Sequence, residues 1–186
     1  MRRFEMVRDV EQPVSGIVTG KFMKRTYGLR EFSADISFLT KNIRDVRRVM
    51  REKLIPSALR ERLMLSVTSV YGCRYCCWVH TREALRSGIE QEEIARLLAG
   101  SMDNCPEEEA IALLYAQHWA DSNASPDPEA TRRLEQAYGD EKAEAINLIL
   151  RMIRVGDLSG NTWDRVLYRV SFGRWGNRLD ALDSIF

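Results

Sequence analysis

The chain has 186 residues, 45% of them hydrophobic and 30% charged, a composition typical of one globular domain with a single sizeable core. Its 28 Lys and Arg nearly balance its 27 Asp and Glu, so the net charge of +1 provides no global field to attract nucleic acid or an anionic membrane. The basic N-terminal pair is not followed by an apolar run, and the longest uncharged stretch near the cysteines, Leu63 to Cys73, falls well short of the roughly 20 residues of a membrane span. We therefore expect a cytoplasmic protein with no nucleic-acid or membrane partner.

The N-terminal part is expected to hold an arm and then a helix. Residues 1–31 mix Gly, Pro and basic residues without a sustained period, so we expect an N-terminal arm there and a helical domain over residues 32–186. One unbroken amphipathic helix is predicted from Ser33 to near Lys53. Its apolar residues recur at helical spacing: Ile36, Leu39, Ile43, Val46 and Met50.

Two further helices are expected on either side of the cysteine cluster. Pro56 and Ser57 can open a helix whose apolar stripe is interrupted at Gly72. The next helix is predicted to begin within the cysteines and to run through His80 as far as Gly88, a residue suited to the left-handed position after a helix end. The cysteines therefore lie in the first turn of a helix.

The second half of the chain also follows helical patterns, and no segment gives a convincing strand, so the predicted fold class is all-α. From Ser171 onwards the pattern weakens, and we expect a tail that packs on a partner subunit. Helices are predicted over 92–98, 106–122, 127–139 and 140–155, with a last helical stretch after Asn161 and Trp163.

Three of the four cysteines lie in the run Cys73-Arg74-Tyr75-Cys76-Cys77, unlike the spread framework of a disulfide-stapled secreted domain. A C-x-x-C pair at a helix start places two thiols within one turn, close enough to form a disulfide, and the helix N-terminus stabilises a thiolate. Such a thiolate is a nucleophile near neutral pH.

Two further residues complete a candidate acid–base site. His80 follows Cys76 by four residues and Cys73 by seven, so all three share one helical face, where an imidazole can act as a general base. Glu61 lies on the preceding helix, and if the two helices pack antiparallel its carboxylate can reach and orient the imidazole of His80.

The spacing Glu61-x11-Cys73-x2-Cys76-x3-His80, followed by Ala84 and Gly88, resembles the signature of the alkylhydroperoxidase D family within the carboxymuconolactone decarboxylase-like superfamily. The resemblance covers about residues 35 to 100. It implies an all-helical oligomer, commonly with the site near a subunit interface. It also implies that Cys76 is the peroxide-reactive cysteine, that Cys73 is its disulfide partner, and that Glu61 and His80 form a proton relay.

The chain departs from the family pattern at two positions. Tyr75 stands between the cysteines where the best-known peroxidases have a histidine, and Cys77 adds a thiol after the pair. A tyrosine hydroxyl can donate a hydrogen bond, but it cannot carry a proton near neutral pH as imidazole does. We expect Tyr75, Cys77 and Trp78 to line the site.

The cluster has two alternative interpretations. The cysteines could be small core residues, or they could bind zinc together with His80 and a fourth ligand, His118 or Cys105. The continuous helical pattern argues against separated zinc knuckles, so no metal is expected. Cys105 is interpreted as a partly buried residue at a helix start, and His118 as a core residue with a satisfied ring.

The leading hypothesis is a thiol-dependent peroxidase or disulfide oxidoreductase that needs no bound cofactor. Its expected partners are a small hydroperoxide, an external dithiol or thioredoxin- or lipoyl-type reductant, and further copies of the chain. The same residues could serve a disulfide reductase that regenerates a separate peroxidase. A carboxymuconolactone decarboxylase-like acid–base enzyme and a non-enzymatic redox sensor remain the alternatives.

Overall fold

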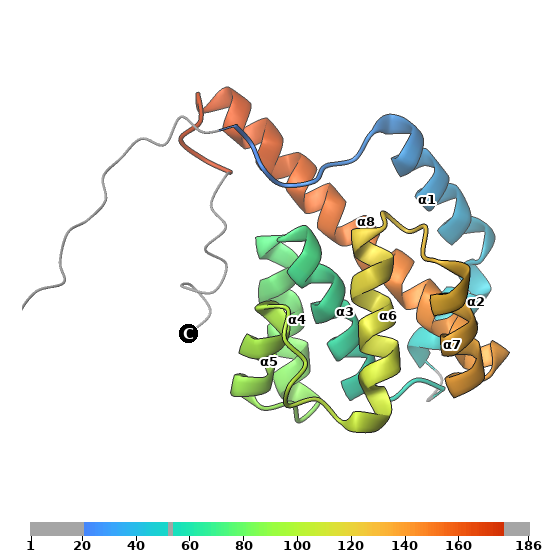
Figure 1. Cartoon of the computed structure of the whole chain (residues 1–186). Helices are drawn as coiled ribbons and strands as arrows, with labels where there is room; N and C mark the ends of the chain where they lie inside the picture. The colour runs from blue at the N-terminus through green and yellow to red at the C-terminus, as the bar shows by residue number, and fades with distance from the viewer. Residues whose placement is uncertain (1–20, 52–53, 177–186) are drawn as a thin grey trace, which may run out of the picture.

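The computed structural model describes residues 21–51 and 54–176, and within them it consists of eight α-helices and one 3₁₀ turn, without a strand (Figure 1). The all-α prediction is confirmed for this part of the chain. The helices are α1 Leu29–Lys41, α2 Ile43–Arg51, α3 Ser57–Tyr71, α4 Arg74–Arg86, α5 Gln91–Leu98, α6 Ala110–Asp121, α7 Pro128–Tyr138 and α8 Asp140–Val170, and the 3₁₀ turn Glu107–Glu109 precedes α6.

Helix α3 lies at the centre of the fold, packed against α4, α5, α6 and α8 (Figure 1). Leu65 lies on the opposite side of α3 from Leu63 and Val67, and all three are fully buried, as expected for a helix that is covered all round. Leu113 of α6 and Ile149 of α8 meet them in the same core. Helix α3 is therefore held in place by packing against four other helices.

The single helix predicted from Ser33 to near Lys53 is wrong, because the structure has two helices there, α1 and α2. The break falls at Asn42, whose side-chain amide and backbone N–H both donate to the carbonyl of Phe38. Asparagine side chains compete in this way with the helical hydrogen-bond ladder and favour helix ends. The predicted helix end at residue 53 lies outside the described residues.

The two helical stretches predicted after residue 140 form one continuous helix, α8, of 31 residues, roughly 46 Å long at 1.5 Å per residue. Its C-terminal half extends beyond the other helices, and residues 21–28 run extended along it (Figure 1). The backbone N–H of Tyr27 donates to the hydroxyl of Thr162 in this contact. Residues 1–20 of the expected arm and residues 177–186 of the expected tail lie outside the described residues.

Helices α3 and α4 are joined by a tight reversal at Gly72, which adopts the left-handed conformation with φ of 68°. Gly88, just after the end of α4, also adopts the left-handed conformation, with φ of 84°, as predicted from the sequence. The reversal at Gly72 brings the cysteines to the end of α3 and lays α4 back along it. Within the described residues, no helix is long and apolar enough to cross a membrane.

Candidate active site

Cys73 begins α4 as its N-cap residue, and its sulfur takes the place that a serine or threonine oxygen usually fills. The Sγ accepts the backbone N–H of Cys76 at 3.3 Å and lies 3.1 Å from the Cys76 Sγ. Cys73 is fully buried, whereas Cys76 is partly exposed. The C-x-x-C pair is thus assembled in its reduced form at a helix N-terminus, with Cys76 as the less buried residue of the two.

The surroundings of the two sulfurs drive their pKa values apart. The hydrogen bond from the Cys76 thiol, followed by the backbone N–H groups of Cys76 and Tyr75, lowers the pKa of Cys73 to about 7 against the opposing effect of burial. The same thiol–thiol bond, burial and the nearby Asp157 carboxylate raise the pKa of Cys76. Near pH 7 about half of Cys73 is therefore thiolate, while Cys76 keeps its proton.

Glu61 and His80 meet because α4 folds back along α3. The Glu61 Oε2 lies 2.8 Å from His80 Nδ1, and its Oε1 accepts from Arg60 Nε at 3.2 Å. Glu61 is buried and its carboxylate is engaged on both oxygens, so it fixes the imidazole orientation. A proton on Nδ1, shared with Glu61, leaves Nε2 as the ring nitrogen that can accept another.

Helix α8 passes close to both sulfurs because it has glycines at the points of approach. A Cβ on Gly160 would lie only 2.6 Å from Cys73 Sγ, and one on Gly156 would lie 3.3 Å from Cys76 Sγ. Any side chain at residue 160 would thus displace the sulfur. The two glycines, which lie between the two helical stretches predicted from the sequence, make room for the cysteine turn.

Asp157 lies between those glycines and was missed from the sequence. Its carboxyl group is fully buried and accepts a hydrogen bond from the Thr68 hydroxyl at 3.2 Å. One carboxylate oxygen and the sulfurs of Cys73 and Cys76 all lie within 4.8 Å of one another. Burial, followed by the charge of Cys73, raises the pKa of Asp157 well above its usual range. The sequence signal that could have revealed it is the spacing of Asp157, Asn161 and Asp164, three polar residues that share one face of the helix.

Asp164, two turns further along α8, organises a second polar cluster that was also missed. It forms a buried ion pair with Lys24 at 2.8 Å and a bond of 3.0 Å with Arg74. The Tyr75 hydroxyl donates to Asp164 Oδ1 at 3.2 Å. The hydroxyl of Tyr75 is therefore directed to Asp164.

The remaining site-lining candidates differ in exposure. Cys77 is buried beside Thr81, and burial raises its pKa to about 11, so this thiol stays protonated near neutral pH. Trp78 is half exposed, with the Arg82 guanidinium 4.8 Å from its ring centre. Cys77 therefore lies on the inner face of α4 and Trp78 on the outer face.

The four-ligand zinc site considered from the sequence is not assembled. Over the described ranges, the His, Cys, Asp and Glu side chains close enough to share an ion are Cys73, Cys76 and Asp157, without His80, His118 or Cys105. The His118 ring accepts the backbone N–H of Asp127 at 3.1 Å, so it is satisfied as expected, but it lies partly exposed and not in the core. Cys105 is partly buried at the start of the segment before α6, as predicted.

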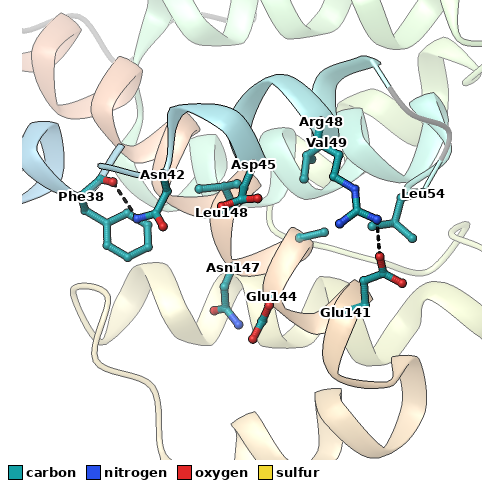
Figure 2. Close-up of a pocket in the computed structure, with 11 residues that line it drawn as sticks. Phe38, Asn42, Asp45, Arg48, Val49, Leu54, Glu141, Glu144, Asn147 and Leu148 are labelled. Atoms are coloured by element: carbon teal, nitrogen blue, oxygen red, sulfur yellow. Dashed lines mark hydrogen bonds and ion pairs between the residues drawn. The ribbon is translucent and has the colours of Figure 1, made fainter. Parts of the chain in front are cut away.

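A separate pocket of about 380 Å³ lies where α1 and α2 cross the N-terminal half of α8 (Figure 2). The ion pair between Arg48 and Glu141, at 2.5 Å, crosses it. No cysteine, nor Glu61 or His80, lines it, so it is distinct from the candidate site. Its lining residues are Phe38, Asn42, Asp45, Arg48, Val49, Leu54, Glu141, Glu144, Ala145, Asn147 and Leu148.

Comparison with known proteins agrees with the resemblance read from the motif. A family model described as the carboxymuconolactone decarboxylase family matches residues 41–117, which contain the cysteine pair, Glu61 and His80. The chain is 27% identical over 125 residues to the uncharacterized protein YdfG of Bacillus subtilis (strain 168), covering 66% of this chain and 80% of that protein. No solved structure gives a significant match. Through residues 41–117 the chain is therefore similar to the carboxymuconolactone decarboxylase family.

Proposed function

We propose that this protein is a thiol-dependent peroxidase that reduces small hydroperoxides at the Cys73–Cys76 pair. The observation that carries the proposal is the 3.1 Å separation of the two sulfurs at the first turn of α4, with the pKa of Cys73 lowered to about 7. A paired thiolate and thiol at this spacing can pass two electrons to an oxidant and close a disulfide.

The difference in exposure supports a division of roles between the cysteines. The peroxide meets the partly exposed Cys76, whose thiolate attacks one peroxide oxygen while the O–O bond breaks and the alkoxide leaves to become an alcohol. The buried Cys73 thiolate then attacks the sulfenic acid, the S–S bond forms, and hydroxide leaves to become water. An external dithiol of the thioredoxin or lipoyl type restores both thiols.

The Glu61–His80 pair supports the proton transfers of this cycle. Because Glu61 fixes His80 through Nδ1 at 2.8 Å, Nε2 can deliver a proton to the departing alkoxide or take one from a thiol through a water molecule. His80 shares one face of α4 with Cys76, which lies one turn earlier.

The first test is peroxide consumption with excess dithiol by wild type, Cys73→Ser, Cys76→Ser and Cys77→Ser, with free thiols counted before and after oxidation. Cys76→Ser should abolish turnover, Cys73→Ser should allow at most one equivalent of rapid reaction, and wild type should lose two thiols. Cys77→Ser is the matched control, since this neighbouring thiol is buried and stays protonated. Turnover by Cys76→Ser, or no loss of thiols from wild type, would contradict the proposal.

A second test addresses the proton relay. Glu61→Gln keeps the size of the side chain but removes the charge that holds the imidazole, and we expect turnover to fall about 10²-fold. Glu83→Gln, at a partly exposed position on α4, is the control and should react as wild type. Loss of turnover in Cys76→Ser with full activity in Glu61→Gln would eliminate the relay.

The acid–base enzyme remains the second candidate, because the family match and the Glu61–His80 bond do not depend on thiols. Such an enzyme would keep its activity on a lactone or carboxylated substrate when both Cys73 and Cys76 are replaced by serine. A redox sensor would form the disulfide without rapid turnover, and a disulfide reductase would reduce a protein disulfide faster than a peroxide.

We also propose that the protein assembles with copies of itself. Apolar side chains are exposed on the outer face of α4, next to the cysteines, and on the projecting half of α8. Exposed apolar patches of this kind mark interaction surfaces. Sedimentation equilibrium should give a mass above the monomer's 21.5 kDa, and Trp163→Glu should lower it. These side chains are Trp78, Val79 and Leu85 on α4 and Trp163, Val166 and Val170 on α8.

A further inference from the structure

The environment of Asp157 differs from that of the other buried carboxylates in the described part of the chain. Asp35 is paired with Arg151 and Arg154, Asp164 with Lys24 and Arg74, and Glu61 with Arg60 and His80. These three side chains thus have cations or an imidazole at their oxygens.

Asp157, fully buried like Asp164, has the Thr68 hydroxyl at 3.2 Å and faces the Cys73 and Cys76 sulfurs. The titratable groups that act on it come from the two helices packed over it, Tyr71 from α3 and Cys73, Cys76 and Cys77 from α4. None of these groups is a cation, and burial of an unpaired carboxylate is costly. Protonation relieves that cost, so the pKa of Asp157 is raised well above its usual range and its carboxylate accepts a proton more readily than an exposed one does.

We propose that Asp157 is the proton acceptor and donor of the Cys76 thiol, exchanging its proton each time the Cys73–Cys76 disulfide forms or breaks. The inference rests on the proposed thiol chemistry. It assigns the proton transfer at the Cys76 thiol to Asp157 of α8. The Glu61–His80 pair then protonates the departing alkoxide.

The proton balance of oxidation closes with this assignment. The Asp157 carboxylate takes the Cys76 proton, and the resulting thiolate attacks the peroxide, whose alkoxide takes a proton from His80 or solvent. When Cys73 displaces hydroxide from the sulfenic acid, the S–O bond breaks, the S–S bond forms, and Asp157 returns its proton to make water. Two electrons have moved from the sulfurs to the peroxide.

Reduction runs the exchange in the opposite direction. One thiolate of a dithiol attacks the Cys76 sulfur, and Cys73 leaves as the thiolate that the amides of α4 stabilise. Asp157, left as a carboxylate by oxidation, takes up a proton from solvent. The second thiol of the reagent loses its proton to solvent and displaces Cys76, whose thiolate takes the proton held by Asp157. The dithiol has lost two protons and two electrons and has become a disulfide.

The test measures disulfide exchange without peroxide, so that it is independent of the proposed peroxidase activity. The full chain is oxidised, and the rate of its reduction by dithiothreitol, corrected for the thiolate fraction of the reagent, is followed from pH 5 to 9 by acid quench and thiol labelling. We expect the wild-type rate to fall as the pH rises through the titration of Asp157. Asp157→Asn should be about 10- to 100-fold slower at pH 7 and should lose this inflection.

Asp164→Asn is the matched control, because it removes a buried carboxylate from the same helix at a position bonded to Lys24 and Arg74. This variant should keep the inflection. Thr68→Val serves as the second variant if Asp157→Asn does not fold, since it removes the hydroxyl that stabilises the carboxylate and should move the inflection to higher pH.

The inference would be overturned if Asp157→Asn were reduced at wild-type rates with the wild-type dependence on pH. It would also be overturned if the inflection of Thr68→Val stayed at the wild-type pH. If wild type consumes no peroxide but shows the Asp157-dependent profile, the proposed function fails and the inference stands. If wild type is an active peroxidase with an Asp157-independent profile, only the inference fails.

Discussion

Replacing Gly160 with alanine tests how closely the cysteine turn depends on α8. A Cβ at residue 160 would lie 2.6 Å from Cys73 Sγ, whereas ordinary contacts begin at 3.4 Å, so sulfur or helix must move by about 0.8 Å. The Cys73 sulfur is bonded at 3.1 Å to Cys76 Sγ and at 3.3 Å to the Cys76 N–H. A shift of this size would weaken both bonds.

The expected magnitudes come from two opposing effects. Alanine stabilises a helix interior by about 1 kcal/mol relative to glycine, whereas overpacking a core costs about 1–3 kcal/mol. Gly160→Ala should therefore be destabilised by about 1 kcal/mol. Gly156→Ala, with a contact of 3.3 Å to Cys76 Sγ that a few tenths of an ångström would relieve, should be neutral or slightly stabilised.

Urea unfolding of the reduced proteins gives the free energy of unfolding, and thiolate absorbance near 240 nm gives the Cys73 titration. Gly160→Ala should also move the pKa of Cys73 upward from about 7, because the bonds that lower it are lengthened. Ser159→Ala, at an exposed position on the same helix, controls for alanine itself. A Gly160→Ala protein as stable as Gly156→Ala, with an unshifted thiol titration, would refute the reasoning.

Two further predictions concern the same end of the fold. Lys24→Met leaves Asp164 paired with Arg74 but removes its buried lysine, so the free energy of unfolding should fall by about 2–3 kcal/mol. The control Lys21→Met, at an exposed position, should change the free energy of unfolding by less than about 0.5 kcal/mol. The lowered pKa of Cys73 stabilises the reduced fold above the unfolded thiol's pKa near 9, and this contribution is lost as the pH falls through about 7. Cys76→Ala removes the thiol that donates to Cys73, so it should raise the pKa of Cys73 and weaken this dependence. Urea unfolding at pH 6.5 and 8.5 measures it, and equal pH dependence in both proteins would contradict the prediction.

Periodicity and breakers predicted most helices because these signals are local. The helix that begins at Ser57 ends at Gly72 as predicted, since the left-handed turn there requires only the glycine itself. The break at Asn42 was missed because the apolar spacing continues through it. The helix breaks there because the Asn42 side chain donates a hydrogen bond to the carbonyl of Phe38, a polar effect that hydrophobic periodicity does not report.

The approach of distant segments was harder to predict than the motif. Glu61 and His80 meet at 2.8 Å because two neighbouring helices fold back on one another, which their short connection made foreseeable. Gly156, Asp157 and Gly160 lie 80 or more residues after Cys73 and Cys76, and nothing local links them to the site. The sequence therefore predicted two helical stretches on either side of the glycines, whereas the structure has one continuous helix that approaches the sulfurs there.

The position of Cys73 makes one sulfur atom both a helix cap and a redox centre. In the reduced state its partial negative charge accepts the N–H of Cys76 and complements the positive end of α4. Bonding that sulfur to a second sulfur removes the charge, so the first turn of α4 is held less tightly when the disulfide is present. Amide hydrogens of this turn should then exchange faster with solvent in the oxidised protein, which would make local opening of α4 a readout of the redox state.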